Sequence, residues 1–150
     1  MESKEYVLSK MRDIGLQAAE VLQAKAPEMD GTALIDNEDD IPEFNPDKHQ
    51  YLNWKVGEVV RDDGQVWQLL QPYDSTIYKD RPKDMRAQWG LCHTKDPAKA
   101  KPFVPAQGDS GMHMKGECCI AKDGSVRRSK IDNNVWPPTE YPDGWEIVEI

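Results

Sequence analysis

The chain has 150 residues, with 19 basic and 27 acidic side chains, a net charge of −8 at pH 7 and an isoelectric point near 4.9. Nucleic acids and anionic membrane surfaces are held by clustered Lys and Arg, so this acidic balance argues against both as partners. The length fits one ordinary domain or two to three very small modules.

The N-terminal segment has the apolar spacing of an amphipathic helix. Its seam residues recur at intervals of 4, 3, 4 and 3, and they are Val7, Met11, Ile14, Ala18 and Val21. The helix should end near Ala26, because a residue that precedes proline is pushed out of the α region. We therefore predict an N-terminal helix over residues 1–26 that either packs on the rest of the chain or mediates docking and self-association.

Residues 27–50 are dense in Pro, Asp, Asn and Glu, which predicts an irregular linker with one apolar anchor at Ala33-Leu34-Ile35. The acidic run at residues 37–40 lacks the alternating ligand spacing and the central glycine of a calcium loop. No metal is expected there.

Two stretches after Tyr51 have the same pattern of strand, turn and strand. They read GEVVRDDGQVW, from Gly57, and GECCIAKDGSVR, from Gly116. Each has an Asp-Gly hairpin signal, and each is followed by a proline seven residues before a closing tryptophan. We predict two copies of one β-module, over residues 51–92 and 112–150, joined by a connector over residues 93–111.

The expected fold class is therefore mainly β: an N-terminal amphipathic helix followed by two small antiparallel β-modules joined by proline-rich loops. The chain has three cysteines, Cys92, Cys118 and Cys119, and an odd number cannot all be paired in disulfides within one chain. This favours reduced thiols and synthesis in a cytosol. No apolar run is long enough to span a membrane, and the first residues lack the apolar core of a signal peptide.

Motifs of catalysis are absent from the sequence, which has no G-x-S-x-G, no glycine-rich phosphate loop and no H-E-x-x-H. The nearest approach to a zinc cluster is His113 with Cys118 and Cys119, but no C-x-x-C accompanies them. We predict buried structural thiols, no cofactor and no enzymatic activity.

The aromatic residues are more informative, because five Trp and five Tyr accompany only two Phe. Trp and Tyr are favoured where a ring is half packed and half presented to a partner. Those next to apolar strands are predicted core residues, namely Trp67, Trp89 and Trp145. Those in loops are candidates for stacking on sugar rings, namely Trp136, Tyr78, Tyr73 and Tyr141; packing over the small cores is the alternative.

The layout of G-x-x-V, an Asp-Gly turn, a Val-Trp strand, a proline loop and a closing Trp resembles the small chitin-binding-type carbohydrate-binding modules of families five and twelve. The phrase IDNNVWPPTEYPDGWEIV is similar to the end of such modules in tail-associated proteins of phages and prophages of Gram-positive bacteria. The resemblance extends from about Ala33 to the C-terminus. The sequence departs from the family pattern at two places. Arg127 stands where the other copy has Trp67, and Thr76-Ile77-Tyr78 stands where a Trp pair is expected.

The resemblance implies a non-enzymatic virion protein of a tailed phage, made in the bacterial host cytoplasm, whose modules attach to a host-surface glycan. The sugar platforms would lie at about Tyr78 in the first module and Trp136 in the second. Partners would be other virion proteins and host-surface polysaccharide. We also expect a homo-oligomer, with a trimer favoured for a fibre. The alternative is a purely structural head, tail or fibre protein that binds no sugar.

Overall fold

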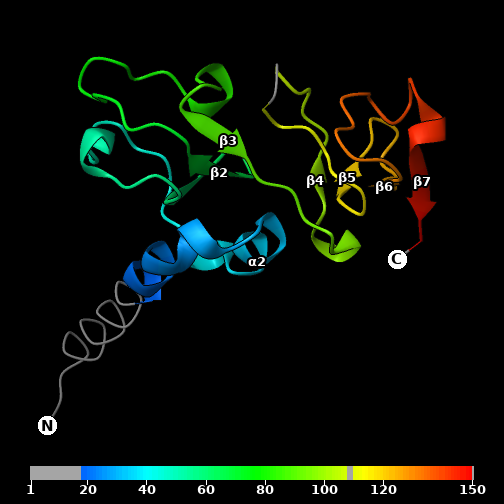
Figure 1. Ribbon diagram of the computed structural model, residues 1–150, viewed down its shortest axis with the longest axis horizontal. Helices are drawn as coiled ribbons and strands as arrows, with labels where there is room; N and C mark the ends of the chain where they lie inside the picture. The colour runs from blue at the N-terminus through cyan, green and yellow to red at the C-terminus, as the bar shows by residue number, and fades with distance from the viewer. Residues whose placement is uncertain (1–17, 108–109, 150) are drawn as a thin grey trace, which may run out of the picture.

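A computed structural model describes residues 18–107 and 110–149 of the chain. The fold is mainly β, with a short N-terminal helix and two small sheets, which confirms the predicted fold class (Figure 1). In the described residues no helix combines the length and the apolar character that crossing a membrane requires.

The first sheet has three antiparallel strands in the order β1-β2-β3. These are β1 (Val59–Asp62), β2 (Gln65–Leu69) and β3 (Trp89–Leu91). The tight turn between β1 and β2 places Asp63 and Gly64 at φ of 53° and 74°. Asp and Gly tolerate positive φ better than most residues, which explains why the Asp-Gly pair stands at this turn.

The second sheet has four strands in the order β4-β5-β6-β7. They are β4 (Lys101–Pro102), β5 (Cys118–Ile120), β6 (Val126–Ser129) and β7 (Trp145–Val148). The last three are antiparallel, whereas β4 comes from the connector and pairs with β5 in parallel. The connector thus adds an edge strand to the second module.

The two hairpins share their geometry as well as their sequence pattern. Gly57 and Gly116 have φ of 99° and 93°, and their N–H groups donate to the carbonyls of Leu69 and Ser129 at 2.8 and 2.9 Å. The next residues, Glu58 and Glu117, accept from the Leu69 and Ser129 amides at 2.8 Å in both copies. Glycine is needed at the start of each hairpin, because a residue with a side chain is strained at this φ.

The segment of residues 27–50, expected as a linker, is packed. It contains α2 (Gly31–Asp36), where the side chain of the N-cap residue Asp30 accepts from the Ala33 amide at 2.8 Å. Leu34, Ile35 and Ile41 are buried against Val59, Val66 and Cys92 of the first sheet. The predicted apolar anchor at residues 33–35 is thus part of the core, together with Ile41, although the composition of the whole segment is polar.

Short 3₁₀ turns occupy much of the remaining chain. They are η1 (Ala26–Glu28), η2 (Glu38–Asp40), η3 (Tyr51–Asn53), η4 (Pro82–Asp84), η5 (Pro97–Lys99) and η6 (Pro142–Gly144). Four of them begin with proline at their first or second position, where its missing N–H costs no hydrogen bond.

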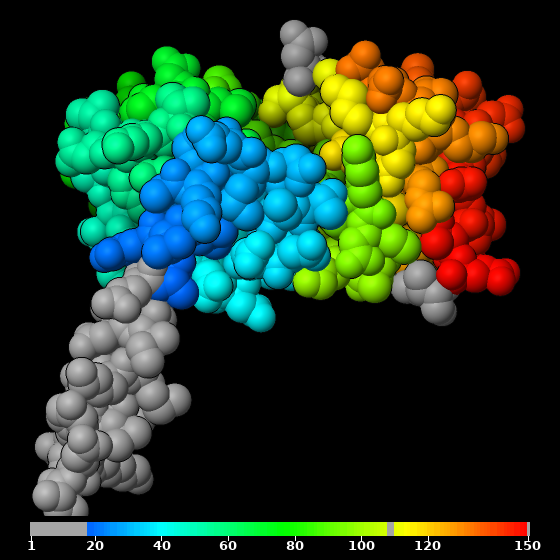
Figure 2. All heavy atoms as spheres, turned by 60° about the horizontal axis from the view of Figure 1, so that its bottom comes forward, coloured from blue at the N-terminus to red at the C-terminus, as the bar shows by residue number. Residues whose placement is uncertain are grey.

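The segment of residues 27–50, which contains α2, contacts both modules. Its α2 lies against the chain that leaves β3: the Lys95 amide donates to Thr32 Oγ1 at 2.9 Å, and Lys101 pairs with Glu38. The backbone is so close that a Cβ on Gly31 would lie 2.1 Å from the His93 carbonyl oxygen. Figure 2 shows this segment lying across the front of the molecule between the green and the yellow parts.

Candidate functional site

The second module presents two aromatic rings in the loop between β6 and β7. Trp136 is 54% exposed and Tyr141 is 40% exposed. Their ring centroids are 6.0 Å apart with an interplanar angle of 65°. We call this pair the aromatic platform. Exposed rings of this size are favoured at recognition surfaces, because a flat ligand face can stack on them.

The backbone that carries Trp136 is held on both sides. Its amide donates to Asn134 Oδ1 at 3.1 Å, and its carbonyl accepts from Trp145 Nε1 at 3.0 Å. Asn134 is itself 1% exposed, and its amide group donates to Ser129 Oγ and the Gly144 carbonyl, both at 3.1 Å. The platform is therefore built on the module core, and little ordering is required when a ligand binds.

The position of Tyr141 depends on a glycine. Its amide donates to the Pro137 carbonyl at 3.0 Å, which closes the proline turn. Its ring lies over Gly144, where a Cβ would approach the Tyr141 ring atoms to 2.9 Å. The two prolines and this glycine therefore set the separation between the two platform rings.

A largely apolar groove of about 410 Å³ lies beside the platform loop. It is formed by β4 and the residues after it, by the end of β5 and by the proline turn, and its apolar lining includes Pro102, Phe103, Ile120, Pro137 and Pro138. Lys122 and Glu140 supply charged groups at the same groove. Concave apolar surfaces with a few polar groups are the usual form of ligand sites.

The first module presents Tyr78, which is 57% exposed, next to Ile77, which is 68% exposed. The Tyr78 amide donates to the Asp74 carbonyl at 3.0 Å. In the described part of the chain no second ring pairs with Tyr78, so the first module offers a single ring where the second offers two.

Tyr73 does not belong to this surface, which corrects its prediction as a glycan-binding candidate. It is 7% exposed, and its hydroxyl accepts from Trp89 Nε1 at 2.9 Å. Burial raises the pKa of the Tyr73 hydroxyl. Its loop sequence resembles that of Tyr78, but the ring is needed to satisfy the buried indole N–H of Trp89.

The three predicted core tryptophans are buried: Trp67, Trp89 and Trp145 are 2%, 0% and 3% exposed. In the second module, Arg127 occupies the strand position of Trp67 and is 9% exposed. Its guanidinium bonds to Ser125 Oγ at 2.8 Å and to Asp123 at 3.2 Å. The arginine is thus satisfied by its own turn, and it lies on the hairpin, not on the platform loop.

The predicted docking residues are only partly described. Val7, Met11 and Ile14 lie outside the described residues. In the helix over residues 18–25, Leu22 is buried against the first sheet, whereas Val21 is 53% exposed. Gln23 fixes this orientation, because its side chain bonds to the Val59 amide and carbonyl at 2.8 and 2.7 Å. Ala18, Val21 and Met29 line an open hollow of about 540 Å³.

A stack of two histidines, which no sequence motif predicts, lies where the chain from β3 meets the second module. The rings of His93 and His113 are 3.6 Å apart with an interplanar angle of 22°. The two residues are 8% and 1% exposed. His93 Nε2 bonds to the Gly111 carbonyl at 2.8 Å, whereas neither ring nitrogen of His113 has a partner among residues 18–107 and 110–149.

Both imidazoles are held neutral. Burial lowers the pKa of His93 to about 4, with a smaller contribution from Arg86 in the same direction. Burial also lowers the pKa of His113 to about 2, and the neighbouring His93 adds to this effect. At neutral pH the two uncharged rings therefore pack in the interior like other buried rings. Adding a proton to either ring destabilises the folded state.

The cysteines are all buried and free. Burial raises the pKa of the Cys92 and Cys119 thiols to about 12, and that of Cys118 in the same direction. The thiols therefore stay protonated at neutral pH, and the protonated form of a thiol is not its nucleophilic form. Within residues 18–107 and 110–149, no three His, Cys, Asp or Glu side chains gather as a metal site.

Comparison of the chain with known protein families, with curated proteins and with solved structures gives no match.

Proposed function

We propose that the protein is a non-enzymatic structural component of a tailed-phage virion and that its second module attaches to a glycan on the host surface through the aromatic platform. The observation that carries this proposal is the exposed pair of rings at Trp136 and Tyr141, 6.0 Å apart on a rigid loop. A pyranose ring has a flat C–H face that stacks on such rings.

The groove beside the platform supports the same function. Its apolar lining at Phe103 and the prolines can accept the apolar parts of a ligand that extends beyond one ring. Lys122 and Glu140 can bond to hydroxyl or amide groups. A single stacking contact is weak, so many copies on one particle would act through avidity.

The proposal is tested by retention on glycan surfaces. The protein is displayed in many copies on a bead and is passed over insoluble chitin, peptidoglycan and whole Gram-positive cells. We expect retention on at least one of these, with elution by the matching soluble oligosaccharide. A multivalent sample that passes through all three would contradict attachment through sugar.

The second candidate function is a purely structural one, in which the chain contacts only other virion proteins or copies of itself. The observation that favours it is Val21, an apolar side chain that is 53% exposed in the seam predicted for self-association. Leu22 and Gln23 hold this helix on the first module, and among the described residues Val21 stays more than half exposed for contact with a partner.

This candidate predicts that Val21→Asp shifts the protein from a trimer to a monomer in light scattering, because a carboxylate in an apolar helix seam must be desolvated on association. The matched control is Val56→Asp, at a valine that is 56% exposed outside the helix, which should leave the mass unchanged. A monomeric wild type argues against self-association, and a Val21→Asp variant that stays a trimer argues against this side of the helix as the contact.

A further inference from the structure

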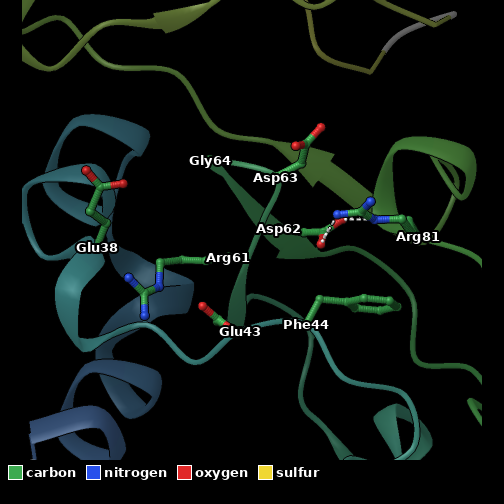
Figure 3. Close-up of a pocket in the computed structure, with 8 residues that line it drawn as sticks. All are labelled: Glu38, Glu43, Phe44, Arg61, Asp62, Asp63, Gly64 and Arg81. Atoms are coloured by element: carbon green, nitrogen blue, oxygen red, sulfur yellow. Dashed lines mark hydrogen bonds and ion pairs between the residues drawn. The ribbon is translucent and has the colours of Figure 1, made fainter.

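A second cavity, of about 390 Å³, lies beside the first hairpin, in the other module from the aromatic platform (Figure 3). Its lining comes from Glu38 in η2, from Glu43 and Phe44, from Arg61 to Gly64 at the end of β1 and its turn, and from Arg81. We call it the hairpin pocket. Its volume is within the range of about 300–1,000 Å³ that is usual for small-molecule sites.

The walls of the hairpin pocket are fixed by backbone hydrogen bonds. The Phe44 amide donates to the Arg61 carbonyl, and the Arg61 amide donates to the Pro42 carbonyl, both at 2.8 Å. These bonds hold residues 42–44 alongside β1 as a short parallel bridge. The lining is therefore set before any ligand arrives, which lowers the entropy lost on binding.

The charged side chains are also held in place. Arg81 bonds to both carboxylate oxygens of Asp62, at 2.9 and 2.7 Å. Arg61 is anchored by its Nε, which donates to the Ile41 carbonyl at 2.7 Å. Among the described residues its guanidinium makes no ion pair. Figure 3 shows that the guanidinium points away from β1 and lies between Glu38 and Glu43.

One aromatic ring completes the pocket. Phe44 lies below the Arg81 and Asp62 pair in Figure 3. It stacks on Tyr51 at 5.5 Å with an interplanar angle of 7°, and it meets Trp89 edge-on at 6.1 Å. The core thus supports Phe44 from behind, while the ring contributes an apolar surface to a pocket that is otherwise polar.

The balance of these groups identifies the ligand class. Two lining carboxylates are already paired, Glu38 with Lys101 and Asp62 with Arg81. The pocket then offers guanidinium donors at Arg61 and carboxylate acceptors at Glu43 and Asp63. An anion would meet the carboxylates and a cation would meet Arg61, whereas a hydroxyl group both donates and accepts. Guanidinium and carboxylate groups are planar and can each bond to two neighbouring hydroxyls.

We infer that the hairpin pocket binds a neutral sugar ring, with its hydroxyls bonded to Arg61, Glu43 and Asp63 and its apolar face against Phe44. The inference rests on the proposed function only in its choice of a sugar as the class of ligand. It is built from other residues than the aromatic platform, in the other module. Each site can therefore bind or fail to bind without the other.

The inference is tested on the full chain by NMR titration with maltotriose, cellotriose and chitotriose. We expect at least one of these to shift the backbone amides of residues 43–44, 61–64 and 81 at millimolar concentration. Glu43→Gln and Asp63→Asn should each weaken that binding by about tenfold, since each removes a charged acceptor. Asn is tolerated at φ of 53°, so the turn should persist.

Asp47→Asn is the matched control, because this carboxylate is exposed and pairs with Lys79 outside the pocket lining; it should leave the binding unchanged. Trp136→Ala should also leave it unchanged, which separates this site from the platform. Three results would overturn the inference: no shift at these amides, no weakening in either pocket variant, or tighter binding of galacturonate or N-acetylarginine amide than of the neutral sugars.

Discussion

Lowering the pH from 7.5 to 5 is expected to reduce the free energy of unfolding by about 4 kcal/mol through the histidine stack, or about 2 kcal/mol for each ring. The pKa of His93 falls to about 4 in the folded protein and that of His113 to about 2, from an ordinary value of 6.5. At pH 5 the unfolded chain therefore binds two protons that the folded chain excludes.

The direction follows from the lowered pKa values. Each group contributes its full stability above pH 6.5, and this stability is lost as the pH falls toward the folded-state pKa of each ring. The pKa values of the Asp74 and Asp123 carboxyl groups are lowered, and such groups affect stability only below about pH 4. These two groups therefore do not mask the loss of stability that the histidines cause between pH 6.5 and pH 4. Urea unfolding followed by Trp fluorescence across this window measures the effect.

His113→Phe should remove about half of this acid loss. The variant forfeits no hydrogen bond, because both ring nitrogens of His113 are unpartnered, and its ring can stack on His93 and Phe103. The control is His49→Gln, at a half-buried histidine outside the stack, which should change the acid profile much less. An unchanged profile in His113→Phe would show that the stack is not the acid-sensitive element.

Trp89→Ala is expected to destabilise the protein by about 3–5 kcal/mol. The side chain is fully buried, so its removal leaves a cavity among Phe44, Tyr51 and Tyr73. It also leaves the buried Tyr73 hydroxyl without the indole N–H that it accepts from.

Trp136→Ala is the matched control for this experiment, since the same substitution at a ring that is 54% exposed should cost under about 1 kcal/mol. Thermal and urea unfolding of the two variants give the comparison. Similar losses in both would mean that Trp136 belongs to the core and would remove it from the platform.

The hairpins and their closing tryptophans could be predicted from the sequence, because local chemistry determines them. Positive φ at Gly57 and Gly116 and the turn at Asp63 and Gly64 require these residue types, and the apolar strand around Trp67 indicates a buried ring. The same reasoning identified Trp136 and Tyr141 as loop residues, since turn formers surround both.

The remaining features depend on contacts that are distant in the sequence. Tyr73 and Tyr78 stand in similar loops, and only the position of the Trp89 indole decides that Tyr73 turns inward. Likewise, His93 and His113 are 20 positions apart and have no common motif, so their stacking follows from how the two modules meet. The helical structure of α2 was not predicted, because only two buried apolar side chains, Leu34 and Ile35, anchor so short a helix.

Attachment to a host glycan through the exposed Trp136 ring, as proposed, can be tested by retention of multivalent Trp136→Ala on the surface that retains the wild type. Ile147→Ala, at another exposed apolar residue, is the control. We expect Trp136→Ala to lose retention at least tenfold while its melting temperature stays within a few degrees of the wild type. Full retention by Trp136→Ala would show that this ring does not hold the glycan.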